Sequence, residues 1–381
     1  MCIYENPHTG ARELIKPRTE AQELRKPLTE ARRHGGKKKE KRRMKNEISL
    51  ISFFSSSVSL CPCARLFPIV LFIFIFPSFL HARGGEESVK PLTIYGIKGS
   101  SGVGIIRLFE EPPQIRGFDV RLEALAQADL MAARFLSGEA QVGILPPNMA
   151  AKIRSSDKDI QAAAVIGAGM LSLLSADPSV QRIEDLRGKT VEVAVQGATP
   201  DYVFRRILGF HGLTPDRDVT LGYSLAPPEI AQSLIAGRVS LALLPEPFAT
   251  MALAGRPGLV TVSDIQEEWV RSGGIGNYPM TLLVVDGAFA SANAGAVEMI
   301  LDAVKNSIEW VKANPVGAGT LVEKHDLGLR APVVTAAVPR SNYVFIPAAE
   351  ARPSLEALFR VFLENAPASI GAMPGNGFYW R

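Results

Sequence analysis

The sequence predicts an α/β protein with two lobes, preceded by a segment that lies outside the fold. From Leu92 onward, short apolar runs alternate with amphipathic stretches, a pattern typical of strands joined by crossover helices in a mainly parallel sheet. The polar segment 175–188 contains a proline and indicates a crossing into a second α/β unit. The length of 381 residues suits two domains of roughly 100 to 200 residues each.

Apolar runs and their boundaries define the elements of the first unit. Alternating or continuous apolar runs predict strands, and Asp129 and Gly138 mark the start and end of an amphipathic helix. The expected elements are strand 92–97, helix core 105–110, strand 118–124, helix 129–138, and strands 142–145, 162–166 and 170–174.

The second unit and the return of the chain follow from the same patterns. The expected elements are strand 190–195, helix 200–211, helix 229–235, strand 239–244, helix 248–253, the returning strand 280–285, helix 294–313, a helix from Pro315, and helix 354–364. In helix 294–313 the apolar residues form one stripe at helical spacing. We therefore predict a discontinuous first lobe of residues 92–175 plus 275–381, a second lobe of residues 176–274, and a hinge of two crossing strands.

The composition is that of a globular protein and argues against nucleic-acid binding. Hydrophobic residues make up 47% of the chain and charged residues 21%, which leaves enough apolar surface to offset the entropy of folding. Residues 1–46 hold 14 Lys/Arg and 6 Asp/Glu, whereas residues 84–381 hold 26 and 31. Because the positive excess lies in the tail, the folded region lacks the clustered positive charge of nucleic-acid-binding domains.

The cysteines and histidines narrow the chemistry of the folded region. The cysteines Cys2, Cys61 and Cys63 all precede residue 64, so we expect no disulfide, thiolate nucleophile or cysteine metal ligand there. His211 and His325 are its only histidines, which argues against a metal site built from several histidines. We expect neither a metal nor a cofactor.

Residues 1–65 are interpreted as a disordered basic extension. Segments 11–21 and 21–31 are similar, each contains a proline, and apolar residues are too few for a core. A run of basic residues follows at 37–45. The extension either has an interaction role of its own or is not translated, with Met44 as the true start.

Residues 66–83 are expected to be the core and cleavage region of a signal peptide. The apolar stretch 66–80 is short for a membrane span of about 20 residues, and cleavage after Ala82 would give a mature protein that begins near Arg83. An uncleaved N-terminal membrane anchor is the alternative. No cysteine directly follows the apolar core for lipid attachment, so we expect a soluble periplasmic protein.

Four local patterns resemble those of a known family. They are FLSGEAQVG at 135–143, IEDLRGKTV at 183–191, LLPEPF at 243–248 and MPGNGFYW at 373–380. In their order and spacing the chain resembles the nitrate, sulfonate and taurine group of periplasmic solute-binding proteins of ABC importers, which includes thiamine-precursor binders. The family typically has Asp where this chain has Gln141.

The resemblance implies a fold and a function. The fold is the type II periplasmic binding protein fold, in which two α/β lobes are joined by a two-strand hinge with a ligand cleft between them. The function is to capture a small organic molecule and deliver it to the permease subunits of an ABC transporter. We expect the protein to act as a monomer, and the resemblance does not name the ligand.

Strand ends provide the first candidate ligand-binding residues. In open α/β sheets, ligands bind beyond the carboxyl ends of strands, where loops and helix N-termini meet. The loops after the first and third strands and after strand 190–195 occupy such positions and offer hydroxyls, an amide and backbone N–H groups. The candidate residues are Gly99, Ser100, Ser101, Asn148, Gln196, Gly197, Ala198 and Thr199.

Two of these residues have alternative structural interpretations. Asn148, after two stiffening prolines, either presents its amide to a ligand or caps the next helix. Thr199 is expected as the N-cap of a helix whose first residue is Pro200. Asp201 would then lie in the first turn and offset the helix dipole. This arrangement favours a neutral or cationic ligand over nitrate or a sulfonate.

Three further candidates lie near the expected hinge. By resemblance, Glu246 lines or supports the pocket; alternatively, it stabilises the first turn of a helix that begins at Pro247. Asn277 and Tyr278 can supply an amide and an aromatic face to a ligand, although a tyrosine before a proline is also a common packing residue.

The residues available for catalysis are few. Two histidines without a nucleophile-elbow motif do not predict a Ser-His-Asp triad, and we interpret Glu267 and Glu268 as a solvated helix face. The loop at Gly99 lacks the third glycine of the dinucleotide motif and the ending of a P-loop. We therefore expect a binding protein and not an enzyme. The alternative is a dehydratase of the menaquinone-pathway type, or another small-molecule enzyme of this fold, against which an export signal argues.

Overall fold

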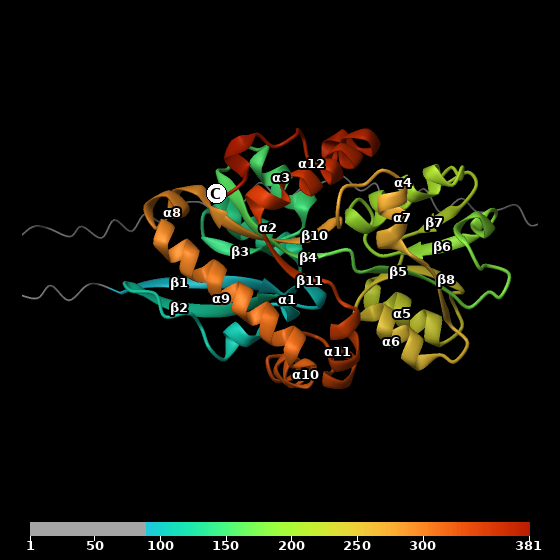
Figure 1. Cartoon of the computed structure of the whole chain (residues 1–381), viewed down its shortest axis with the longest axis horizontal. Helices are drawn as coiled ribbons and strands as arrows, with labels where there is room; N and C mark the ends of the chain where they lie inside the picture. Colours follow the sequence, from blue (N-terminus) through green and yellow to red (C-terminus); the bar gives the residue numbers. More distant parts are fainter. Residues whose placement is uncertain (1–88) are drawn as a thin grey trace, which may run out of the picture. The chain divides into compact units, whose positions relative to one another are not determined.

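The structure, a computed structural model, describes residues 89–381 (Figure 1). The predicted extension 1–65, the start at Met44 and the signal peptide 66–83 lie outside the described residues. Within the described part of the chain, no helix is both long enough and apolar enough to cross a membrane.

The first lobe is built on a six-stranded mixed sheet with the strand order β11-β4-β10-β3-β1-β2. Its strands are β1 (Lys90–Ile97), β2 (Phe118–Leu125), β3 (Val142–Leu145), β4 (Ile160–Ala168), β10 (Pro279–Asp286) and β11 (Tyr343–Pro347). Strands β1, β2 and β3 run parallel, and β10 lies antiparallel between β3 and β4. The carboxyl ends of β1 and β3 therefore meet at one edge, which carries the loops of the candidate site.

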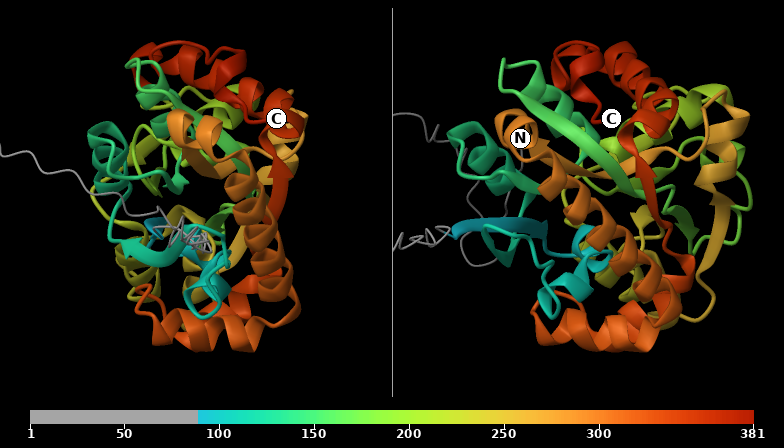
Figure 2. Two further views of the ribbon diagram at one scale, coloured as in Figure 1. Left: turned by 90° about the vertical axis from the view of Figure 1, so that its left-hand side faces the viewer. Right: turned by 60° about the vertical axis from the view of Figure 1, so that its left-hand side comes forward.

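Helices cover both faces of this sheet. They are α1 (Ser100–Val103), α2 (Ala128–Ser137), α3 (Pro147–Arg154), α8 (Gly287–Ala292), α9 (Ala294–Ala313), α10 (Pro315–Lys324), α11 (Ala331–Ala337) and α12 (Ala348–Asn365), with 3₁₀ turns η1 (Ile106–Phe109), η3 (Val338–Arg340), η4 (Pro367–Ser369) and η5 (Asn376–Phe378). Helix α9 packs on one face, whereas α2, α3 and α12 gather on the other (Figure 2). The predicted stripe of α9 is buried except for Leu301, which is partly buried.

The second lobe is built on a five-stranded sheet with the order β7-β6-β8-β5-β9. Its elements are β5 (Leu171–Ser175), η2 (Ile183–Leu186), β6 (Thr190–Val193), α4 (Thr199–Phe210), β7 (Thr220–Gly222), α5 (Pro227–Ile235), β8 (Leu241–Pro245), α6 (Phe248–Gly255), β9 (Val260–Asp264) and α7 (Ile265–Arg271). Strands β6 and β8 are parallel neighbours, so α4 and α6 both begin at the same edge of this sheet.

Strand β5 corrects the predicted position of the first crossing. It pairs with β8 and β9 of the second sheet, so the chain changes lobe between Ala168 and Leu171 and not within 175–188. The apolar run is almost continuous through both strands, because each is buried in its own sheet. Gly169, at φ +48°, makes the turn, and a Cβ there would collide with the side chain of Gln266.

Other boundaries also differ from the prediction. The helix expected at 105–110 is only the 3₁₀ turn η1, because α1 already begins at Ser100. The last long helix begins at Ala348 and not at residue 354, and it contains Pro353. The prediction gave no bounds for α3 and α7 and omitted β7, β9, β11, α8 and α11, whose sequences are short or only partly apolar.

The two chain crossings are joined by hydrogen bonds at the hinge. The N–H of Gly169 donates to the carbonyl of Tyr278 at 3.0 Å, and the N–H of Leu171 donates to the Tyr278 hydroxyl at 3.2 Å. The Tyr278 ring is fully buried, at 0% exposure, edge-on to Trp269 with 5.9 Å between ring centroids. Burial raises the pKa of the Tyr278 hydroxyl above its ordinary value, so the group stays protonated.

We expect Tyr278→Phe to lower the free energy of unfolding by about 1–3 kcal/mol, because it leaves the buried Leu171 N–H without its acceptor. Urea unfolding measures the change. Thr220→Val, at an exposed position on β7, is the control and is expected to have little effect. Equal stability of Tyr278→Phe and the wild type would contradict this role of the hydroxyl.

Candidate functional site

Asn148 links the two lobes. It lies in the first turn of α3, directly beyond β3, and its Nδ2 donates to the carbonyl of Gly197 in the second lobe over a long 3.4 Å. The N-cap of α3 is Pro146, and no side chain caps this helix. The capping interpretation of Asn148 is therefore wrong, and its amide lies where the strand ends of the two lobes face each other.

At the N-terminus of α4, Asp201 accepts the backbone hydrogen bond that was predicted for Thr199. The N-cap is Ala198, Thr199 is already helical, and no side chain caps the helix, so the predicted N-cap role of Thr199 is wrong. The nearly buried Asp201 instead accepts from the N–H of Gly197 at 2.8 Å. Asp201 lies in the first turn of α4, and its side chain reaches back to the loop before the helix.

The charge of Asp201 is compensated inside the second lobe. Its Oδ1 accepts from Arg205 Nε at 2.7 Å and from the Tyr223 hydroxyl at 2.6 Å. Burial and the hydrogen bond to Asp201 raise the pKa of the Tyr223 hydroxyl, which therefore remains a donor. Arg205 also donates to Asp216 at 2.9 Å, so this guanidinium is fully engaged.

Three neutral polar atoms around this edge have no hydrogen-bond partner within the described chain. They are Asn148 Oδ1, Thr199 Oγ1 and Thr250 Oγ1, all buried. Thr199 is 2% exposed and Thr250 is 7% exposed. Buried polar atoms are nearly always satisfied, by protein, water or a ligand, so these atoms are candidates for contact with a bound molecule. They follow β3, β6 and β8, the strands whose carboxyl ends form the two facing edges.

Glu246 joins the lobes a second time, near the hinge. The carboxylate is 2% exposed, and its Oε2 accepts from the N–H of Thr250 in the first turn of α6 at 3.0 Å. Its Oε1 accepts from Arg340 Nε of the first lobe, also at 3.0 Å. Both oxygens are thus held by the protein, so Glu246 stabilises the helix start and supports the region between the lobes.

The remaining candidates take different positions. Gly99, at φ +90°, precedes the four-residue α1, and the Ser100 carbonyl accepts from the Tyr343 hydroxyl at 3.2 Å. Ser101 is partly buried beside it, and Gln196 is exposed on the loop before α4. Asn277 is partly buried. Tyr278 is fully buried in the hinge, where the packing interpretation fits its geometry better than a ligand-contact role.

An aromatic contact between α4 and α12 completes the interface between the lobes. The Tyr202 and Phe362 rings are edge-on, with 5.0 Å between centroids and an angle of 79°. Behind them, Arg206 of α4 lies 3.9 Å from Glu364 of α12. The N-terminal turn of α4, with Thr199, is therefore held against the first lobe.

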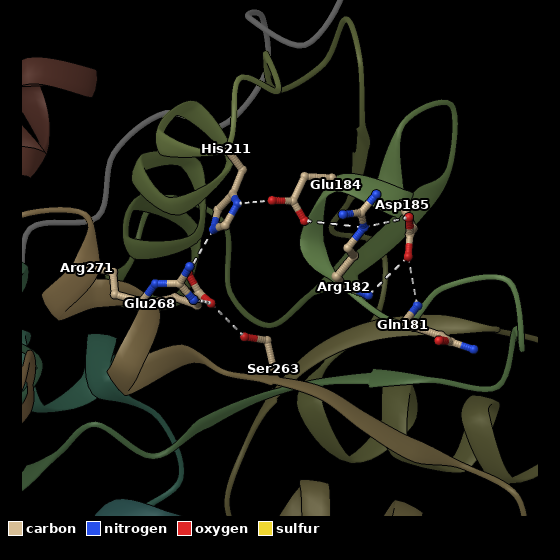
Figure 3. A network of polar contacts seen from close by, with 8 residues as sticks. All are labelled: Gln181, Arg182, Glu184, Asp185, His211, Ser263, Glu268 and Arg271. Carbon is tan, nitrogen blue, oxygen red and sulfur yellow. Dashed lines mark hydrogen bonds and ion pairs between the residues drawn. The ribbon is translucent and has the colours of Figure 1, made fainter.

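A histidine cluster, which the sequence did not indicate, ties three elements of the second lobe together (Figure 3). His211 at the end of α4 contacts Glu184 of η2 through Nδ1 and Glu268 of α7 through Nε2, both at 2.7 Å. Glu268 also accepts from Arg271 at 2.8 Å and from the Ser263 hydroxyl at 3.3 Å. Glu268 is 6% exposed, so its interpretation as part of a solvated helix face is wrong.

The two carboxylates determine the charge of His211. Burial lowers the pKa of the imidazole, but the hydrogen bonds to Glu268 and Glu184 outweigh this effect and raise the pKa above its ordinary value. The pKa of the Glu184 carboxyl is lowered, first by a hydrogen bond from the Glu184 backbone N–H and then by the hydrogen bond from His211. A doubly protonated ring donating to two carboxylates has no nitrogen left to act as a base, so the cluster is a structural clamp. No group of three or more metal-ligating side chains in the described region is arranged to hold a metal ion.

We expect His211→Gln to destabilise the protein by about 1.5–3 kcal/mol near pH 6, the range for hydrogen bonds to charged groups. Since the folded pKa is raised, the stabilisation is complete below the ordinary pKa of about 6.5 and is lost as pH rises through the folded value. Thermal or urea unfolding at a series of pH values should show wild type and variant converging on the alkaline side. A difference in stability that does not change between acidic and alkaline pH would contradict the clamp.

A known protein family matches this chain by sequence. The model of the NMT1-like family matches residues 128–321, just over half of the 381-residue chain. No curated protein matches the chain by sequence.

Solved structures with the same architecture include several transport proteins. An ABC transporter structure from Parabacteroides distasonis is 23% identical with a TM-score of 0.64, and the match covers 77% of this chain and 99% of that one. The periplasmic aliphatic sulphonate binding protein SsuA from Escherichia coli is 18% identical with a TM-score of 0.63 and coverages of 77% and 93%. The periplasmic nitrate-binding protein NrtA from Synechocystis PCC 6803 is 10% identical with a TM-score of 0.53 and coverages of 74% and 84%. These likenesses confirm the predicted two-lobed α/β fold.

Proposed function

This chain belongs to the NMT1-like family, and we propose that it is an extracytoplasmic solute-binding protein that captures a small organic molecule between its lobes and delivers it to the permease of an ABC importer. The neighbours named as sulphonate-binding and nitrate-binding proteins support this class of function. An export segment at 66–83, a periplasmic location and a monomeric state belong to the same proposal.

The observation that carries the proposal is the position of Asn148 and Thr199. They come from opposite lobes, both lie beyond the carboxyl ends of parallel strands, and both have a buried polar atom without a partner in the described chain. A ligand that bonds to both lobes binds the closed arrangement better than an open one, and this difference in affinity is what drives closure.

Binding, rather than catalysis, fits the charged groups around the site. Asp201 and Glu246 are each held by an arginine and a backbone N–H, and His211 is held by two carboxylates. A general base must lie within hydrogen-bond reach of the proton that it removes, whereas these groups are directed at donors of the protein. The dehydratase alternative therefore has no support from these residues.

A thermal-shift screen provides the ligand for a mutational test. The screen contains taurine, alkanesulfonates, nitrate, pyrimidines, riboflavin and amino acids, and a ligand at one hundred times its Kd adds about 2.7 kcal/mol of stability. With the best compound, we expect Asn148→Ala and Thr199→Ala each to weaken binding roughly 5- to 100-fold, since each leaves a ligand group unpaired.

Titration calorimetry measures this loss of affinity, and Thr220→Ala on the exposed strand β7 is the control that should bind like the wild type. Wild-type affinity in both Asn148→Ala and Thr199→Ala, with the fold retained, would reject this site. Conversion of the bound compound by the metal-free protein would reject the function as a binding protein.

We also expect the ligand to shift the lobes toward a closed arrangement by rotation at the two crossings. Hinge motion of this kind needs only a few residues that absorb the dihedral change, here Gly169 and the segment before Tyr278. Small-angle scattering should give a smaller radius of gyration with saturating ligand than without it. An unchanged radius, together with proven binding, would show that the lobes do not move on binding.

A further inference from the structure

The orientation of the Asn148 amide specifies what a ligand must offer. Nδ2 of Asn148 faces the carbonyl of Gly197, which can only accept a hydrogen bond. The amide nitrogen must therefore lie on that side, and Oδ1, which has no partner in the described chain, is left as an acceptor. A bound molecule satisfies Oδ1 only by donating an N–H or O–H.

The second lobe adds two hydroxyls at the facing edge. Thr199 follows β6 and Thr250 follows β8, the neighbouring parallel strands, and neither hydroxyl has a partner in the described chain. A hydroxyl both donates and accepts, so it serves neutral polar groups of either kind. Both residues are buried, and burying a charged group is costly unless the charge is paired.

The arginines near this edge are already paired with groups of the protein. Arg205 is held by Asp201 and Asp216, and Arg340 is bonded to Glu246. Arg206 donates to the carbonyl of Ser272 at 2.6 Å and lies 3.9 Å from Glu364, and its buried Nε has no hydrogen-bond partner in the described chain. The N–H of Gly197, one of the backbone donors that an oxyanion at the start of α4 would use, is taken by the Asp201 carboxylate. An oxyanion here would meet a carboxylate and the lone pairs of Asn148 Oδ1, and it has no proton to donate to either.

We propose, as a refinement that rests on the proposed function, that the ligand is an uncharged organic molecule with an N–H or O–H donor, such as an amide, a heterocyclic amine or an alcohol. Its donor bonds to Asn148 Oδ1, and its other polar groups bond to the hydroxyls of Thr199 and Thr250. This specificity separates the chain from the nitrate-binding and sulphonate-binding proteins whose fold it shares.

The test uses purified wild-type protein dialysed against a metabolite mixture that contains neutral amides, heterocycles and alcohols together with nitrate, alkanesulfonates and carboxylates. Mass spectrometry identifies the compounds that the protein retains. Titration calorimetry then compares matched neutral and anionic probes, namely nicotinamide with nicotinate and methanesulfonamide with methanesulfonate, alongside each retained compound.

We expect the retained compounds to be uncharged donors, with affinities that change less than about twofold between low and high salt because no charge is screened. Thr199→Val should weaken their binding at least about fivefold, whereas Thr220→Val on the exposed strand β7 should not. Retention of nitrate, sulfonates or carboxylates in preference to neutral compounds would overturn the refinement and leave the binding function intact. Retention of no small molecule at all would overturn the binding function and the refinement together.

Discussion

The hydrogen bonds between the two chain crossings are the constraint on which the rest of the structure depends. Gly169 and Leu171 on the outgoing crossing bond to the backbone and hydroxyl of Tyr278 on the returning one. Because the chain passes between the lobes side by side at this point, the carboxyl ends of β1 and β3 are placed opposite those of β6 and β8. Asn148 and Gly197 can meet only in this arrangement.

The buried charges near the facing edges are paired within the protein, and this leaves mainly neutral groups in the region between the lobes. Asp201 is neutralised by Arg205 and Tyr223 within the second lobe, and Glu246 is neutralised by Arg340 across the hinge. Buried charges are costly unless they are paired, so pairing them inside the protein leaves neutral groups to face a ligand. The His211 clamp fixes the far end of α4, so the N-terminal turn that carries Thr199 belongs to a helix anchored at both ends.

The same fold serves proteins described as sulphonate-binding and nitrate-binding, so specificity must lie in the side chains at the strand ends. In the site proposed for this chain, those side chains are an amide whose orientation is set by a carbonyl and two hydroxyls on helix starts. A carboxylate in the first turn of α4 occupies one of the backbone donors that would otherwise attract an anion.

The sequence by itself determined the class of the fold and the order of most elements. Strands β1, β2 and β3 and helices α2, α4 and α9 were predicted to within a few residues, because periodicity and helix boundaries report local exposure and backbone preference. The rule that ligands bind at strand ends also makes Asn148 and Thr199 candidate ligand contacts from the sequence alone. Only the tertiary structure decided which sheet β5 joins, since a buried apolar run has the same pattern in either core. It alone decided that Asp201, and not Thr199, accepts a backbone N–H at the start of α4, that Glu268 is buried against His211, and that Asn148 contacts Gly197. The Glu268–His211 and Asn148–Gly197 contacts join residues dozens of positions apart in the chain. In all three cases, the packing of the elements determines the partner of the polar side chain, and the local sequence pattern does not.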